Sequence, residues 1–192
     1  EQLSAVAFTQ GPGLIGALLV GTCFARSFAQ ALRIPLLGVD HMQAHILAHF
    51  IRDGSNRPVP VFPFLNLTVS GGHTLLVLVR GPLDMEVLGS TVDDAAGEAF
   101  DKGGKTLGLP YPAGPLIDRH AVHGDPRKYK LPVPQVPGSD FSFSGTKTAF
   151  NTLVQRGVAT DPTFVAKELP HLCASLQQSI VDILLRKVYK TA

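Results

Sequence analysis

The fold class follows from the stretch AVAFTQGPGLIGALLVGTCFARSFAQALRIPLLGV, residues 5–39. Ala5–Phe8 is a short apolar run that ends at a Gln-Gly-Pro-Gly turn, a pattern typical of a buried strand. Leu14–Leu32 is interrupted only by two glycines and predicts a long buried helix, and Leu36–Val39 predicts a second strand. A strand, a crossover helix and another strand form a parallel βαβ unit. The sequence therefore predicts an α/β protein.

Beyond residue 60 the pattern changes to short β-rich runs. Three of them have the length and composition of strands: Phe64–Val69, Thr74–Val79 and Glu86–Leu88. Ser70-Gly71-Gly72-His73 joins the first two as a hairpin-like turn, and the loop Asp53–Pro60 separates this meander from the βαβ unit. We therefore expect two domains, residues 1–60 and residues 61–192.

Helical patterns fill most of the remaining sequence. We expect helices over Gln43–Ile51, Ala95–Leu107, Gly114–Val122 and Thr146–Gln155. Proline-rich Gly124–Ser139 predicts an extended surface stretch, and Pro170 fits only near the start of the last helix. The apolar residues of that last helix follow the spacing of one helix face: Leu169, Leu172, Leu176, Ile180, Ile183, Leu184 and Val188.

Composition and charge exclude some classes of protein. The chain has 192 residues with 17 Lys and Arg against 15 Asp and Glu, a net charge of +2. This excludes a protein that binds nucleic acid by bulk charge alone and leaves a local basic groove possible. The apolar share is 45%, which indicates a chain with a packed core. Cys23 and Cys173 make no disulfide framework, so we expect a reducing compartment. The longest apolar run, Leu14–Val20, is too short to span a membrane, and the chain does not open with a secretory signal pattern.

A histidine pair is the first candidate site. His41 and His45 are one helical turn apart, directly after a predicted strand, and two imidazoles at this spacing can share a metal. The alternative is two histidines that face solvent or are satisfied by neighbours. Zinc peptidases of the H-E-x-x-H type need Glu after the first histidine as general base, and here that residue is Met42. His49, a further turn along, could share this face by accident.

Glycine-rich loops are the second kind of candidate. Ser70-Gly71-Gly72-His73-Thr74 could hold a phosphate through backbone N–H groups and hydroxyls, or be an ordinary hairpin turn. Gly114 opens a helix, which allows close approach of a ligand, and Asp118 follows it. The segment Asp140–Thr148 places hydroxyls and a lysine at a helix start, a layout that suits an anion.

Acidic residues around the third predicted helix allow several interpretations. Asp93 or Asp94 could be its N-cap. Asp101 lies too far into the helix to be the cap, on the face shared with Asp94, Gly97 and Glu98. These acids could bind a metal or ribose hydroxyls, or form a solvated acidic face.

Six ordered motifs together resemble one family. They are Gly11-Pro12-Gly13-Leu14, His41-x-x-x-His45, Val69-Ser70-Gly71-Gly72-His73-Thr74, Asp93-Asp94-x-x-Gly97-Glu98-x-x-Asp101-Lys102, Tyr111-Pro112-x-Gly114-Pro115 and Phe141-Ser142-Phe143-Ser144-Gly145. Their order and spacing resemble TsaD, the bacterial tRNA threonylcarbamoyladenosine synthase family once labelled Gcp or O-sialoglycoprotein endopeptidase. The resemblance extends from Ala5 to about Val188.

This resemblance implies a fold, a reaction and a set of site residues. The implied fold is the two-lobed fold of actin, sugar kinases and heat-shock ATPases. The implied reaction transfers threonylcarbamoyl from threonylcarbamoyl-AMP to N6 of adenosine 37 in tRNAs that read codons starting with A. His41 and His45 match the ligands of one divalent metal per subunit, iron or alternatively zinc. The residues that match the substrate and nucleotide site are Thr68, Val69, Ser70, Gly71, Gly72, Asp101, Gly114 and Asp118.

The resemblance also implies partners and marks departures. The implied partners are tRNA, a catalytically silent paralogue like TsaB and an ATPase subunit like TsaE, in the cytoplasm and without a membrane. Compared with the family, the chain is truncated at both ends and lacks a third metal ligand, an Asp, so we expect these 192 residues alone to be inactive. Position 113 is Ala where the family usually has Gly. The alternative functions are a metallopeptidase and a non-catalytic partner subunit with the actin fold.

Overall fold

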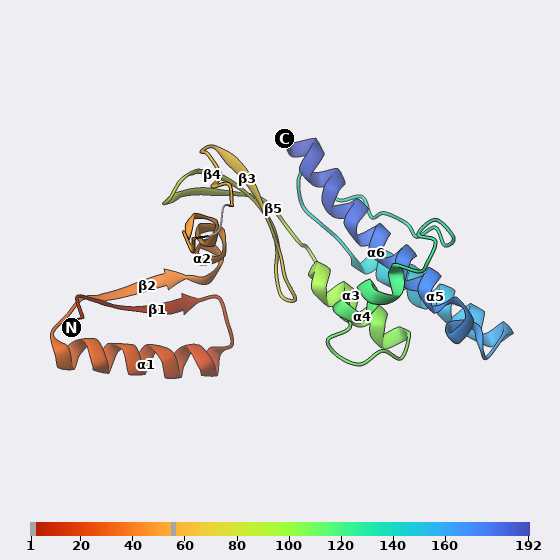
Figure 1. The fold of residues 1–192 in the computed structure, drawn as a ribbon, viewed down its shortest axis with the longest axis horizontal. Coiled ribbons are helices and arrows are strands. Elements are labelled where there is room, and N and C mark those ends of the chain that lie inside the picture. The colour runs from red at the N-terminus through yellow and green to blue at the C-terminus, as the bar shows by residue number, and fades with distance from the viewer. Residues whose placement is uncertain (1–2, 55–56) are drawn as a thin grey trace. The chain divides into compact units, whose positions relative to one another are not determined.

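The computed structural model describes residues 3–54 and 57–192, and Figure 1 shows its course. The described residues form two compact units that divide between Phe62 and Pro63. Each unit has its own sheet, of two strands in the first and three in the second. Both units combine strands with helices, which confirms the α/β class. The assignment of these units to the two lobes of an actin-like fold stays a prediction.

The first unit is the predicted parallel βαβ unit. Strand β1 (Val6–Gly11) pairs in parallel with β2 (Leu36–Asp40), with Val6 opposite Leu36. Helix α1 (Ile15–Leu32) connects them and lies along the strand pair (Figure 1). Helix α2 (His41–Leu47) follows β2 directly, and the short 3-10 helix η1 (Ala48–Phe50) continues it. The expected helix Gln43–Ile51 therefore begins two residues earlier, so that His41 is its first residue.

The predicted burial of α1 and β1 is wrong. Only Ala25 and Ala29 of α1 are buried, whereas Ile15 is 84% exposed and Phe24 is 69% exposed. The residues of β1 are half-buried or exposed. The reason is geometric, because a pair of strands covers only a narrow stripe of a helix and leaves the rest of an apolar helix uncovered.

By length and composition, α1 could also cross a membrane, and it is the one helix among the described residues of which this is true. The apolar run measured in the sequence stopped at Val20, but the helix continues to Leu32. Its contacts with β1 and β2 are those of a crossover helix, and we interpret it as one.

The second unit begins with an antiparallel meander of three strands. Strand β3 (Phe64–Val69) pairs with β4 (Thr74–Gly81), and β4 pairs with β5 (Asp84–Ser90). Val69 lies opposite Thr74, so the turn between the first two strands is the predicted segment from Ser70 to His73.

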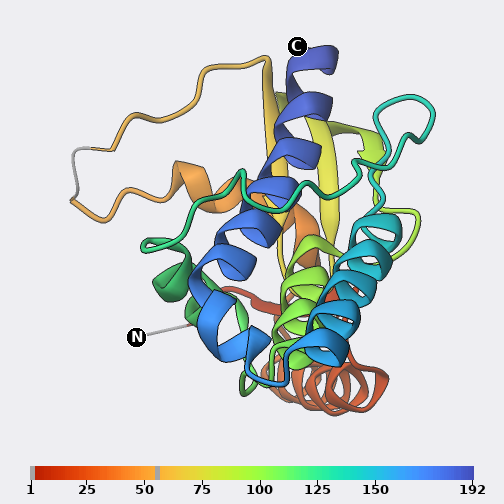
Figure 2. The ribbon, with the colours of Figure 1, turned by 90° about the vertical axis from the view of Figure 1, so that its right-hand side faces the viewer.

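Helices pack together after the meander. They are α3 (Ala96–Thr106), α4 (Gly114–Ala121), α5 (Ser144–Thr160) and α6 (Phe164–Thr191). Helices α3, α5 and α6 lie side by side (Figure 2), and α4 packs on α6. The apolar face predicted for the last helix is confirmed, since Leu172, Leu176, Ile180, Ile183 and Leu184 are all buried.

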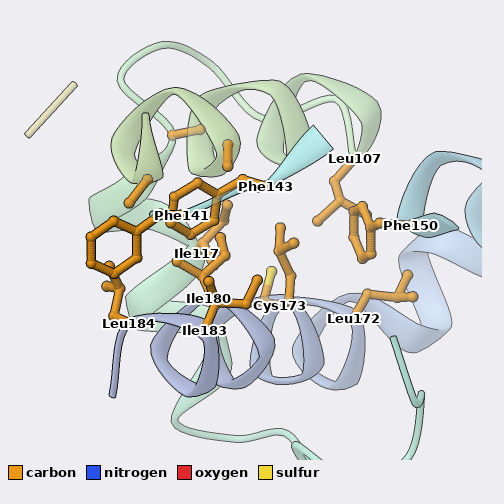
Figure 3. Packing of buried hydrophobic residues seen from close by; sticks show 14 of the residues in the cluster. Leu107, Ile117, Phe141, Phe143, Phe150, Leu172, Cys173, Ile180, Ile183 and Leu184 are labelled. Carbon is orange, nitrogen blue, oxygen red and sulfur yellow. The ribbon is translucent and has the colours of Figure 1, made fainter. Parts of the chain in front are cut away.

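The core of the second unit brings together segments that are far apart in the sequence. Figure 3 shows Cys173, Ile180 and Ile183 of α6 directed toward Ile117 of α4 and toward Phe141. Ile117 and Phe141 are fully buried. Burying a side chain of this size stabilises a fold by roughly 1.5–3 kcal/mol, so this cluster fixes how α3, α4 and the segment before α5 are held.

The position predicted for Pro170 is wrong. Helix α6 begins at Phe164, so Pro170 lies inside it rather than near its start. A proline removes one helical hydrogen bond. Phe164 and Val165 pack against the core, and the Phe164 ring meets the Tyr129 ring edge-on at 6.1 Å. This packing explains why the helix extends back beyond the proline.

Candidate functional site

The histidine pair lies in the first turns of α2. Asp40, the N-cap residue, accepts hydrogen bonds from the backbone N–H groups of Met42 and Gln43, both at 2.9 Å. An Asp at this position stabilises a helix start, and it fixes the turn on which His41 and His45 stand. Both histidines are exposed, and their Nε2 atoms are 3.2 Å apart. The two imidazoles therefore converge rather than point apart.

This convergence fits a metal ion. Two ligands of a tetrahedral metal with bonds of about 2.0–2.1 Å lie about 3.3–3.4 Å apart, which is close to the 3.2 Å between the two Nε2 atoms. The described ranges 3–54 and 57–192 contain no group of three or more His, Cys, Asp or Glu residues that could complete a site. The pair could supply two ligands, and a closed metal site needs further ones.

The loop between β3 and β4 uses its serine internally. The Ser70 N–H donates to the His73 carbonyl at 2.9 Å, and the Ser70 Oγ accepts from the N–H groups of Gly72 at 3.3 Å and His73 at 3.0 Å. The Ser70 hydroxyl therefore closes the turn, and a part for it in phosphate binding stays a prediction. The N–H of Gly71 finds no acceptor in the described part of the chain, and Gly71 is exposed. This backbone group is the loop's available donor.

The loop is attached to the start of α3. The Ser70 carbonyl accepts from the Gly97 N–H at 3.1 Å, and the buried Thr74 Oγ1 accepts from the Ala96 N–H at 2.9 Å. Ala95 is the N-cap residue and supplies no side-chain bond, so Thr74 caps α3 from a neighbouring strand. The alternative in which Asp93 or Asp94 caps this helix is wrong.

Asp93 and Asp94 instead tie α3 to the start of α5. The Asp93 carboxylate accepts from the Ser142 hydroxyl at 2.5 Å and from the Phe143 N–H at 2.8 Å. The Asp94 carboxylate binds the Lys102 ammonium at 2.5 Å and the Lys147 ammonium at 2.6 Å. Lys147 is thus already paired, which weakens the expectation of an anion site at the start of α5.

The two lysines also stabilise the ionised form of the Asp94 carboxyl. Burial alone would raise the pKa of Asp94, but the hydrogen bonds from Lys102 and Lys147 outweigh it, so the pKa of this carboxyl lies below its usual range. The hydrogen bonds that the Lys102 ammonium donates to Asp94 and Glu98 raise the pKa of Lys102. These groups hold one another as ions, and the acids around α3 do not gather into a metal site.

Asp101 holds the segment that leads into α4. Its Oδ1 accepts from the Ala113 N–H at 2.8 Å, and Ala113 is buried. Asp101 also lines a cavity of about 290 Å³, whose other lining residues are Lys102, Lys105, Leu109, Tyr111 and Ala113. One carboxylate oxygen is thus used for structure at the edge of a ligand-sized hollow.

Gly114 and Asp118 have different surroundings. Gly114 opens α4, and a Cβ atom placed there would meet no atom within 4 Å, so the space beside this residue is open. Asp118 accepts from the Gln177 Nε2 of α6 at 3.1 Å and lines a separate cavity of about 220 Å³. Asp101 and Gly114 are therefore close, through Ala113, whereas Asp118 does not share their cavity.

A larger cavity, of about 830 Å³, lies between α3 and α5 and was not foreseen from the sequence. Its polar lining includes Lys102, Lys105, Lys147 and Asn151. The one-turn spacing of Glu98 and Lys102 is visible in the sequence and is typical of an ion pair on one helix face. The pairing of Asp94 with Lys147, 53 residues apart, left no local signal.

The sequence profile of the family described as "tRNA N6-adenosine threonylcarbamoyltransferase" (TsaD) matches residues 1–192. The chain belongs to this family. Proteins of that name from Christiangramia forsetii and Cytophaga hutchinsonii are each 56% identical to it, over 99% and 98% of the chain. The protein of that name from Porphyromonas gingivalis is 50% identical over the whole chain.

Membership of the TsaD family confirms the resemblance read from the six motifs. The chain spans about half the length of the curated relatives it matches, 56% of the C. forsetii protein and 54% of the C. hutchinsonii protein. The names of these TsaD relatives do not favour a peptidase or a silent partner subunit.

Proposed function

We propose that this chain forms part of an enzyme that transfers threonylcarbamoyl from threonylcarbamoyl-AMP to N6 of adenosine 37 in tRNAs that read ANN codons. The observation that carries the proposal is the family match across all 192 residues. The alternatives, a metallopeptidase and a non-catalytic actin-fold subunit, have less support. Met42 stands where a zinc peptidase needs its general base, and the silent paralogues lack the histidine pair that this chain keeps.

The chemistry requires positioning more than a nucleophile. The carboxylic–phosphoric mixed anhydride is already activated, so the protein must hold the carbonyl against the adenine amine and stabilise charge on the departing AMP. In this proposal the exposed Gly71 N–H donates to the acyl-phosphate end of the substrate. The adjoining residues Thr68, Val69, Ser70 and Gly72 shape the loop around that end.

The nucleotide portion of the substrate is assigned to the edge of α3 and α4. One oxygen of Asp101 holds the Ala113 N–H, and we assign the other to a ribose hydroxyl, since ionised acceptors make strong hydrogen bonds to hydroxyls. Gly114 leaves open space for the nucleotide. Asp118 is assigned a further contact with the nucleotide, for which it would exchange its bond to Gln177.

A divalent metal, iron or alternatively zinc, is assigned to His41 and His45, and would supply Lewis acidity when bound. The converging Nε2 atoms support this assignment. The two units are proposed to be parts of the two lobes of an actin-like fold. The proposed partners are tRNA, a silent paralogue and an ATPase subunit, and the proposed compartment is the cytoplasm.

The test uses the complete polypeptide that carries this chain. It is incubated with threonylcarbamoyl-AMP and an unmodified tRNA transcript, and the nucleoside at position 37 is identified by mass spectrometry. A sialoglycoprotein substrate is tested in parallel for peptide cleavage. Formation of threonylcarbamoyladenosine, without cleavage, supports the proposal. Cleavage without nucleoside modification overturns it.

A further inference from the structure

The first turn of α3 is built onto the loop Ser70–His73. Its two leading amides are both satisfied by that hairpin, Gly97 N–H by the Ser70 carbonyl and Ala96 N–H by the Thr74 hydroxyl. The first N–H groups of a helix have no partner within the helix. Here the two acceptors flank the glycines of the loop, one before them and one after them, so α3 fixes both ends of the turn.

Gly97 is placed where no side chain fits. A Cβ atom at this position would lie 2.7 Å from the Ser70 carbonyl oxygen, 2.8 Å from the Gly71 Cα and 2.9 Å from the Gly71 nitrogen. All three are backbone atoms, so no side-chain rotation relieves the contact. The loop itself must move when any other residue replaces Gly97.

Backbone conformation does not explain this glycine. Gly97 does not have a positive φ, and it lies in the first turn of a regular helix. Alanine is the better helix former, by about 1 kcal/mol in a helix interior. The close approach of the loop is therefore the structural reason for a glycine at position 97.

We propose that Gly97 is a positioning residue, which lets α3 seat the Ser70–Gly72 loop so that the Gly71 N–H is held ready for the substrate. This inference rests on the proposed function, in which that loop holds the acyl-phosphate end of threonylcarbamoyl-AMP. Gly97 itself touches no substrate. Its effect is transmitted through the Ser70 carbonyl and the Gly71 backbone, the atoms nearest to it.

The experiment compares Gly97→Ala with Gly103→Ala on the same helix, in the complete polypeptide. A Cβ atom at Gly103 would meet the Leu176 side chain in the core, away from the loop. Each variant is measured for the KM for threonylcarbamoyl-AMP, kcat, Tm and amide hydrogen exchange at residues 70–73. We expect Gly97→Ala to lower kcat/KM at least tenfold and to speed amide exchange in the loop, with little change in Tm. We expect Gly103→Ala to lower Tm and to leave kcat/KM and loop exchange near the parent values.

Thr74→Val keeps the proposal testable if Gly97→Ala does not fold. It removes the acceptor for the Ala96 N–H without adding volume, and should also speed exchange in the loop. Parent-like kcat/KM and parent-like loop exchange in Gly97→Ala would overturn the proposal, as would equal losses in Gly97→Ala and Gly103→Ala. A parent protein that does not modify tRNA contradicts the proposed function instead, and the exchange data still decide whether Gly97 positions the loop.

Discussion

Replacing Asp101 by asparagine and by alanine separates two roles that this carboxylate is given, one structural and one in nucleotide binding. Oδ1 accepts the Ala113 N–H at 2.8 Å, and Ala113 is 2% exposed. Asparagine keeps an acceptor of the same shape and loses the charge. Alanine removes the acceptor and leaves a buried N–H without a partner.

The two substitutions should differ mainly in stability. An unsatisfied buried N–H costs about 1–3 kcal/mol, which for a unit the size of residues 63–192 lowers Tm by roughly 3–12 °C. Asp101→Asn exchanges a charged acceptor for a neutral one and should cost less than about 1 kcal/mol. Asp101→Ala should therefore melt clearly lower than Asp101→Asn.

The same two substitutions should agree in nucleotide affinity. Losing a charged hydrogen bond to a ribose hydroxyl costs roughly 1.5–3 kcal/mol, which weakens AMP binding about tenfold to a hundredfold. Calorimetric titration of the complete polypeptide with AMP measures this. The matched control is Asp182→Asn, which removes the same charge from an α6 residue whose bond is to Gln178. If Asp101→Asn binds AMP like the parent, the carboxylate is structural only and the assignment of its second oxygen fails.

Three further predictions follow from separate parts of the chain. His41→Ala in the complete polypeptide should remove most bound metal by mass spectrometry, while His49→Ala should not, and equal metal in both would contradict the paired-ligand geometry. Lys147→Met should lower the free energy of unfolding by about 1–3 kcal/mol at pH 7, because Asp94 loses one of its two ammonium partners. The pKa of Asp94 is lowered in the fold. The stabilisation from Lys147 is therefore present above the ordinary Asp pKa of about 3.9 and is lost as the pH falls through the lower folded value. A difference in Tm between the parent and Lys147→Met that persists below that pH range would refute this. Cys173 is fully buried and burial raises its pKa to about 11, so iodoacetamide at pH 8 should modify it only after unfolding, and rapid native modification would show that the core opens.

Local patterns in the sequence determined the elements and the family. Alternating and helical spacings depend on neighbours along the chain, so the βαβ unit, the three-stranded meander and the buried face of α6 could be predicted without a structure. The motif order identified the family for the same reason, because it is a property of the sequence alone.

The tertiary structure decided which group each polar side chain binds. Thr74 caps α3 from a strand, Asp93 binds Ser142 and Phe143, and Asp94 binds Lys147. A cap supplied from 22 residues away, or an ion pair across 53 residues, leaves no periodic trace in the sequence. Local spacing made Asp93 and Asp94 reasonable caps, and only the packing of distant segments excluded them.

Burial was also decided in three dimensions. The apolar composition of α1 predicted a buried helix, yet the residues of α1 that are buried are only Ala25 and Ala29. Composition reports how favourable burial would be, whereas exposure depends on which surface lies opposite. The lack of space at Gly97 was likewise decided by the tertiary structure. The sequence shows only a glycine near a helix start, whereas the folded chain shows that the backbone of Ser70 and Gly71 lies directly against it.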